Sequence, residues 1–151
     1  MNKAIETLQE RGFFNQCTDL EALSAKMDEG PVTFYVGADP TGPSLHIGHM
    51  VPFFAFRHLM KFGHKGIALI GGGTGRIGDP SGKTEMRKML TYETIDANVE
   101  NIKNQLDKFL HFDGNNARAA NNKDWLEGLN YIDFLRDIGS CFSVNKMLTF
   151  E

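Results

Sequence analysis

Two histidines spaced three residues apart are the side chains in this sequence best suited to chemistry. His46 and His49 flank Ile47 and Gly48, and they follow the turn-forming segment 40–45. At the start of a helix, this spacing puts both rings on one face, where they can donate hydrogen bonds to charge that develops on a phosphate. Gly48 leaves room for a flat ring to lie against the backbone. The pattern therefore predicts a site for a phosphorylated ligand.

Two other interpretations of the histidine pair are an accidental surface pair and a metal site. Catalytic zinc takes three protein ligands, and the sequence offers no third Cys, His or carboxylate at ligand spacing. We therefore expect no metal-binding residue. Because short motifs also arise by chance, the elements around the histidines decide between the two interpretations that are left.

The residues on either side predict a strand, a turn and a helix. Residues 32–36 form a β-branched and aromatic run that Gly37 breaks, the pattern of a buried strand. Pro52 lies early enough in the following helix to be tolerated. The helix should cover one sheet face with Ile47, Val51, Phe54 and Leu59. Such a unit places a helix start at the carboxyl edge of a sheet, where open α/β folds bind phosphorylated ligands.

Further periodic segments predict the rest of an α/β domain. We expect short helices before Gly12 and over residues 20–27, a parallel strand at 67–70, a weaker strand at 117–120, a buried indole at Trp125, and helices over 131–138 and after Ser143. The long helix that Thr91 caps should bury Ile95, Val99, Ile102, Leu106, Phe109 and Leu110.

The glycine-rich segment 71–84 imitates two nucleotide-binding motifs. Residues 73–78 fit G-x-G-x-x-G, but the Asp-Pro-Ser-Gly sequence that follows cannot continue the helix this motif must open. Residues 78–84 end in Gly-Lys-Thr, yet they are one residue short of a P-loop. We interpret the segment as a loop that could close over a polyphosphate, with a solvated surface loop as the alternative. The charged residues that it and its continuation carry are Asp79, Lys83 and Arg87.

Length and composition limit the classes of protein that fit. The 151 residues are 41% hydrophobic, enough for one domain with a core, and the net charge of −3 provides no global basic field for nucleic acid. Cys17 and Cys141 form no C-x-x-C pair, which favours reduced thiols. The first residues lack a signal or transit pattern, and no apolar run could span a bilayer. We expect a cytoplasmic protein without a membrane partner.

The motif His46-Ile47-Gly48-His49 resembles the signature of the class I aminoacyl-tRNA synthetases, and its surroundings resemble those of the bacterial-type tyrosyl-tRNA synthetases. The supporting segments are residues 35–41, 71–75, 77–83, 121–125 and 134–137. The resemblance implies an α/β fold, Rossmann-like and nucleotide-binding, with a parallel sheet and helices on both faces. It also implies an N-terminal helical segment over residues 1–30 and the N-terminal half of the catalytic domain over residues 31–151.

The same resemblance implies a tyrosine–tRNA ligase that activates L-tyrosine with ATP and Mg2+ and transfers it to tRNA(Tyr), as a homodimer. The resemblance implies that the catalytic residues are Thr41, His46, His49, Lys83 and Arg87. Those it assigns to ATP are Gly37, Asp39, Pro40, Thr41, His46, Gly48 and His49. Those it assigns to tyrosine are Tyr35, Asp79 and Asn122. One departure is Val36, which stands where many relatives carry a cysteine that faces the ribose.

Several parts of the family have no counterpart in this sequence. They are the second half of the nucleotide fold, the Tyr-x-x-x-Gln-x-x-Asp helix, the Lys-rich loop and the anticodon-binding part, so we expect the isolated chain to be inactive. One alternative is another class I adenylyl transferase, such as a tryptophanyl-tRNA synthetase. Another is a non-catalytic fragment that binds ATP or tyrosine. Tyr35 and Asp79 favour tyrosine, because the pair could bracket a phenol.

Overall fold

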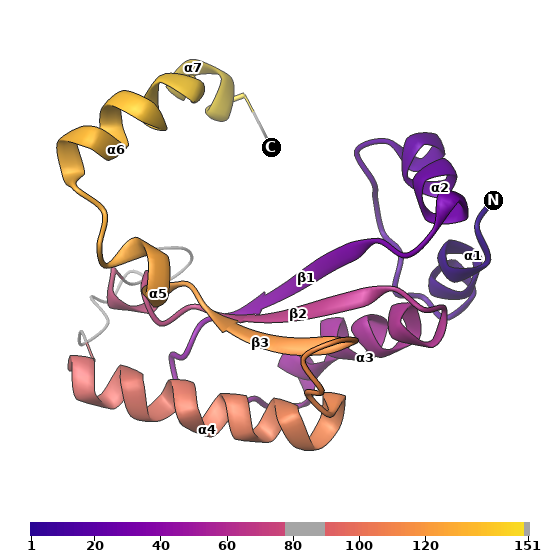
Figure 1. Cartoon of the computed structure of the whole chain (residues 1–151), viewed down its shortest axis with the longest axis horizontal. Coiled ribbons are helices and arrows are strands. Elements are labelled where there is room, and N and C mark those ends of the chain that lie inside the picture. Colours follow the sequence, from indigo (N-terminus) through magenta and orange to yellow (C-terminus); the bar gives the residue numbers. More distant parts are fainter. Residues whose placement is uncertain (78–89, 150–151) are drawn as a thin grey trace.

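Three parallel strands form the sheet of the computed structural model, which describes residues 1–77 and 90–149 (Figure 1). The strands β1 (Thr33–Ala38), β2 (Lys65–Ile70) and β3 (Ala117–Asn121) lie side by side in chain order. Ala38 pairs with Ile70, and Ile70 pairs with Asn121. The three carboxyl ends therefore meet at one edge of the sheet, as the sequence predicted.

The helices begin largely where their capping residues predicted. They are α1 (Lys3–Glu10), α2 (Leu20–Glu29), α3 (Ile47–Lys61), α4 (Tyr92–Leu110), α5 (Lys123–Leu126), α6 (Tyr131–Asp137) and α7 (Val144–Met147), with 3-10 turns at Thr74–Arg76 and Gly139–Cys141. Asp19, Thr91 and Ser143 each accept a hydrogen bond from an amide in the first turn of the helix they precede. Gly63 follows the end of α3 with φ of 84°, the left-handed conformation that glycine adopts most readily.

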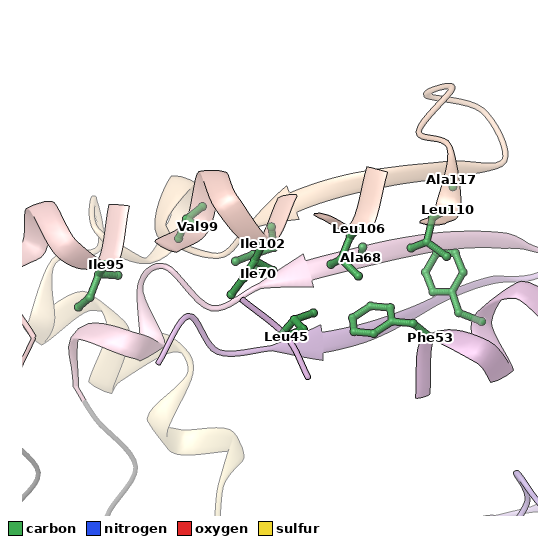
Figure 2. Close-up of a cluster of buried hydrophobic side chains, with 11 residues drawn as sticks. Leu45, Phe53, Ala68, Ile70, Ile95, Val99, Ile102, Leu106, Leu110 and Ala117 are labelled. Carbon is green, nitrogen blue, oxygen red and sulfur yellow. The ribbon is translucent and has the colours of Figure 1, made fainter. Parts of the chain in front are cut away.

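The packed core lies on one face of the sheet, between the strands and the two crossover helices α3 and α4 (Figure 2). The other face is open at β1, where Tyr35 is 69% exposed. The two crossover helices therefore lie on the same face of the sheet. When each new strand is added on the same side of the previous one, right-handed crossovers place all their helices on one face of the sheet. Helices cover the other face only where the strand order reverses. The Rossmann-like α/β arrangement with a parallel sheet is confirmed.

The face that α3 buries differs from the predicted one. Phe53 and Phe56 are 1% and 0% exposed, whereas Val51 and Phe54 are 48% and 39% exposed. The ring of Phe56 fills the space above Gly66 in β2, where a Cβ would collide with it. Because α3 is apolar on most sides, hydrophobic spacing alone offered two candidate stripes, and the small residue in the sheet selects between them.

Three local expectations need correction. The strand β1 runs through Gly37 to Ala38 instead of breaking, and it is a half-exposed edge strand rather than a buried one. Pro52 is the sixth residue of α3, beyond the first turn, so it provides no amide hydrogen for the Gly48 carbonyl. Trp125 lies in the short helix α5 and is 50% exposed, so its indole is not buried.

The two N-terminal helices form a small apolar cluster of their own. Ala4 and Ile5 of α1 and Met27 of α2 are buried there, and Leu59 packs against them from α3. This cluster fits the predicted helical segment over residues 1–30, whose boundary stays a prediction. Among the described residues, no helix has the length and apolar character needed to span a membrane.

Candidate functional site

His46 is the N-cap of α3, and its ring has two distinct ends. Its Nδ1 accepts hydrogen bonds from the amides of Gly48 at 3.1 Å and His49 at 3.4 Å. A neutral imidazole that accepts at Nδ1 carries its proton on Nε2, so Nε2–H is the donor available to a ligand. The ring that Gly48 accommodates against its backbone is that of His46 itself, because a Cβ there would lie 3.0 Å from His46 Cε1.

The second histidine is held against the first. The rings of His46 and His49 stack with centroids 3.6 Å apart and an interplanar angle of 22°. Both side chains are exposed at the start of α3. The predicted shared face is therefore confirmed, and the two stacked rings lie at the positive end of the α3 dipole, an arrangement suited to an anion.

The connection between β1 and α3, residues 39–46, brings the predicted ATP residues to the carboxyl edge of the sheet. Asp39 follows β1 directly, and its Oδ1 accepts a hydrogen bond from Thr74 Oγ1 at 2.8 Å. A Cβ at Gly71 would collide with the same carboxylate, so glycine is required where β2 ends. Thr41 is exposed in this connection.

Asn122 holds the glycine-rich turn that follows β2. Its Oδ1 accepts from the amides of Gly73 at 2.7 Å and Thr74 at 3.4 Å, and its Nδ2 donates to Thr74 Oγ1 at 3.0 Å. Asn121 accepts from the Gly72 amide at 3.1 Å. The Asn122 side chain is buried, and one of its two amide hydrogens is left for any tyrosine contact.

The other predicted site residues fall into two groups. Tyr35 and Gly37 lie in β1 at positions that face the open side of the sheet, because the alternate residues Phe34, Val36 and Ala38 pack against the core. Asp79, Lys83 and Arg87 lie outside the described residues. The structure thus brings together the predicted ATP residues around β1 and α3.

Three residues near this edge were missed by the sequence reasoning. Thr74 bridges Asp39 and Asn122, and Asn98 and Gln105 of α4 bind the backbone of residues 39–46. The sequence did contain a signal for Asn98 and Gln105. These two polar residues interrupt the apolar face of a long helix, and a polar residue at a core position needs a hydrogen-bond partner.

A charged cluster lies beside the glycine-rich turn. Arg76 pairs with Glu127 at 2.7 Å and with Asp96 at 3.4 Å, and Lys123 binds Asp96 at 3.0 Å. The hydrogen bond from Lys123 is the main cause that lowers the pKa of Asp96. The guanidinium of Arg76 also lies 4.2 Å from the centroid of the Tyr92 ring.

A pocket of about 530 Å³ adjoins this cluster, and none of the predicted ATP or tyrosine residues that the structure describes lines it. Its walls come from Arg76, Tyr92, Leu126, Tyr131 and Phe134, among others. The pocket and the histidine edge are therefore separate features. The imidazole groups of His46 and His49, which suit a phosphate, lie at the histidine edge and do not line this pocket.

The family model for tRNA synthetases class I (W and Y) matches residues 27–151. Two similar curated proteins are the tyrosine–tRNA ligases of Treponema denticola and Treponema pallidum. They are 69% and 66% identical to this chain over 151 residues, which is 100% of this chain and 37% of each relative. The chain thus spans little more than a third of the length of these relatives.

Two solved structures share the fold. A C-terminally truncated Aspergillus nidulans mitochondrial tyrosyl-tRNA synthetase aligns with a TM-score of 0.86 and 29% identity, over 98% of this chain and 45% of that one. The tryptophanyl-tRNA synthetase of Trypanosoma brucei aligns with a TM-score of 0.64 over 95% of this chain and 41% of that one. At 20% identity, the second likeness shows the fold alone.

Proposed function

We propose, from the premise that this chain belongs to the class I tRNA synthetases (W and Y), that it provides the ATP-facing part of a tyrosine–tRNA ligase. The observation that carries the proposal is the position of His46. Its Nδ1 is engaged by the first amides of α3, and its Nε2–H is directed away from them at the carboxyl edge of the sheet. This is a preorganised donor at a place where open α/β folds bind nucleotides.

The reaction that suits these residues is attack by the tyrosine carboxylate on the α-phosphate of ATP, with pyrophosphate as the leaving group. Such a transfer needs positioned donors and no enzyme nucleophile. His46 would donate from Nε2 to a phosphate oxygen as charge develops, assisted by Thr41. His49, stacked on His46, would lie against the ribose. Mg2+ would enter bound to the ATP phosphates.

The remaining contacts to ATP follow from the residues near the strand ends. Gly37, Asp39, Pro40 and Gly48 would shape the ATP cleft. The bond from Thr74 fixes one oxygen of the Asp39 carboxylate. Lys83 and Arg87, which lie outside the described residues, would hold the leaving pyrophosphate by resemblance to the family.

Tyrosine would bind between Tyr35, Asp79 and Asn122. The exposure of Tyr35 leaves its phenol free to meet a ligand on the open face of the sheet. Asn122 would contribute through the amide hydrogen that Thr74 does not use. The names of the bacterial relatives favour tyrosine over tryptophan as the substrate.

The whole enzyme would transfer the activated tyrosine to tRNA(Tyr), as a homodimer in the cytoplasm. With a net charge of −3, this chain has no overall attraction for RNA, so its tRNA contacts would be local.

Tyrosine-dependent exchange between ATP and pyrophosphate tests the proposal. The assay uses a chimera in which this chain replaces the matched residues of the Treponema denticola tyrosine–tRNA ligase, over which the two are 69% identical. We expect exchange near the rate of the parent ligase with tyrosine, and none above background with tryptophan. The chain by itself should give no exchange. A folded chimera that is inactive with tyrosine, or equally active with tryptophan, would refute the proposal.

A further inference from the structure

Two amide side chains of α4 bind the backbone that connects β1 to α3. Asn98 and Gln105 are seven residues apart, so they lie on the same face of the helix, two turns from each other. Their neighbours on this face are Ile95, Val99, Ile102 and Leu106, each 4% exposed or less. The two amides are therefore attached to a helix that the core holds rigidly.

Asn98 acts at the first end of the connection. Its Nδ2 donates to the carbonyl oxygen of Pro40 at 3.1 Å, in a buried contact. The carbonyl of Pro40 belongs to the planar peptide that joins Pro40 to Thr41. The hydrogen bond therefore sets the orientation of the peptide from which Thr41 continues.

Gln105 acts at the other end with two hydrogen bonds. Its Nε2 donates to the carbonyl oxygen of Leu45, and its Oε1 accepts from the Leu45 amide, both at 2.8 Å. The Leu45 carbonyl belongs to the peptide that joins Leu45 to His46. The side chain of Leu45 is itself buried, at 7% exposure. The backbone that leads into His46 is thus held at Leu45 by three contacts, through the amide, the carbonyl and the buried side chain of that residue.

We propose that Asn98 and Gln105 are positioning residues, which place Thr41 and His46 for transfer at the α-phosphate. The inference rests on the function proposed above. Each amide holds the peptide that directly precedes one of the two side chains expected to meet the phosphates. A donor to developing charge works only when its position is fixed before the reaction. The hydrogen bonds at Nδ1 and the stacking on His49 hold the His46 ring relative to the start of α3, so its place in the site depends on the backbone that enters this helix. The exposed side chain of Thr41 likewise depends on the peptide that precedes it.

The test compares Gln105→Met with Asn104→Met in the chimera. The first change removes both hydrogen bonds and keeps the bulk of the side chain, and the second places the same side chain at the exposed neighbouring position. We expect Gln105→Met to lower kcat for exchange at least tenfold with the KM for tyrosine unchanged, and Asn104→Met to leave both unchanged. Equal effects of the two variants would overturn the proposal.

A double-mutant cycle separates positioning from a general loss of structure. If Gln105 acts through His46, Gln105→Met should lower kcat no further in a His46→Ala background. A cycle of Asn98→Leu with Thr41→Ala should behave in the same way, with Asn101→Leu at an exposed position as its control. Additive losses in both cycles would show that the amides do not act through these two residues.

A measurement without turnover keeps this inference distinct from the proposed function. The imidazole resonances of His46 in the 151-residue chain should shift with Gln105→Met and stay in place with Asn104→Met. Where Gln105→Met does not fold, Gln105→Glu takes its place, since it retains an acceptor for the Leu45 amide and loses the donor to the Leu45 carbonyl. Unshifted resonances would overturn the proposal. An active His46→Ala chimera with shifted resonances in Gln105→Met would instead refute the role of His46.

Discussion

The two ends of the His46 ring have different tasks, and a pair of substitutions separates them. Nδ1 caps α3 by accepting from the amides of Gly48 and His49, and Nε2 is free to donate. Asparagine is a preferred N-cap whose side-chain oxygen accepts the same amides, whereas alanine offers no acceptor. Neither residue reproduces the imidazole donor. We therefore expect His46→Asn to keep the cap and lose the chemistry, and His46→Ala to lose both.

The magnitudes follow from each contact. Replacement of an N-cap by alanine costs about 1 kcal/mol, so His46→Ala should unfold more easily than His46→Asn by about that amount. Both variants lose the stacking of His46 on His49, so the difference between them isolates the cap. Loss of one donor to developing charge lowers a rate by about 10²-fold or more, and both variants should show it.

Urea denaturation of the 151-residue chain measures the first quantity, and pyrophosphate exchange by the chimera measures the second. Ile47→Ala is the matched control, because Ile47 lies in the same helical turn and is 76% exposed. It should change neither quantity appreciably. If His46→Asn retained the exchange rate of the parent chimera, His46 would be a cap alone. If the two variants were equally stable, the capping argument would fail.

Three further predictions concern stability. Phe56→Ala should lower the free energy of unfolding by ~3–5 kcal/mol and Phe54→Ala by about 1 kcal/mol, since only the ring of Phe56 is fully buried. Urea denaturation measures both, and equal losses would contradict the assigned buried face of α3. Burial lowers the pKa of His64, so the unfolded chain binds a proton more readily and stability should fall as pH drops below about 6.5. His64→Gln should reduce that fall, and an unchanged pH profile would contradict the argument. Backbone amides of residues 115–117 lower the pKa of Asp113 to about 2, so its contribution, present above pH ~4, should be lost towards pH 2; Asp113→Asn should remove this part of the acid transition, measured by circular dichroism.

Features that depend on local chemistry were predictable from the sequence. Asp19, Thr91 and Ser143 cap helices because each offers a side-chain oxygen to amides that lack a partner. The spacing of His46 and His49 fixed their shared face, since a helix start has one geometry. The parallel pairing of β1 with β2 was also predictable, because a helix joins the two apolar segments and such a crossover connects parallel strands.

Features that depend on contacts between distant segments were not predictable in the same way. Which stripe of α3 is buried was decided by Gly66, whose missing side chain admits the ring of Phe56. The partners of Asn122 are the amides of a turn about fifty residues earlier in the chain, and no local pattern announces them. Trp125 lies in the short helix α5 and is 50% exposed, where a buried indole was expected.

Asn98 and Gln105, the polar residues on the core face of α4, depend both on a local sequence pattern and on contacts with a distant segment. A helix that needed only to cover the sheet would gain from an apolar side chain at position 98 or 105, since burial of an unpaired amide is costly. Both amides are instead paired with the backbone of the connection between β1 and α3. In this connection Asp39, Thr41 and His46 are exposed, whereas Pro40 and Leu45, near its two ends, are buried. The same helix that closes the core therefore also sets the place where α3 begins, so core packing and the geometry of the histidine edge depend on one element.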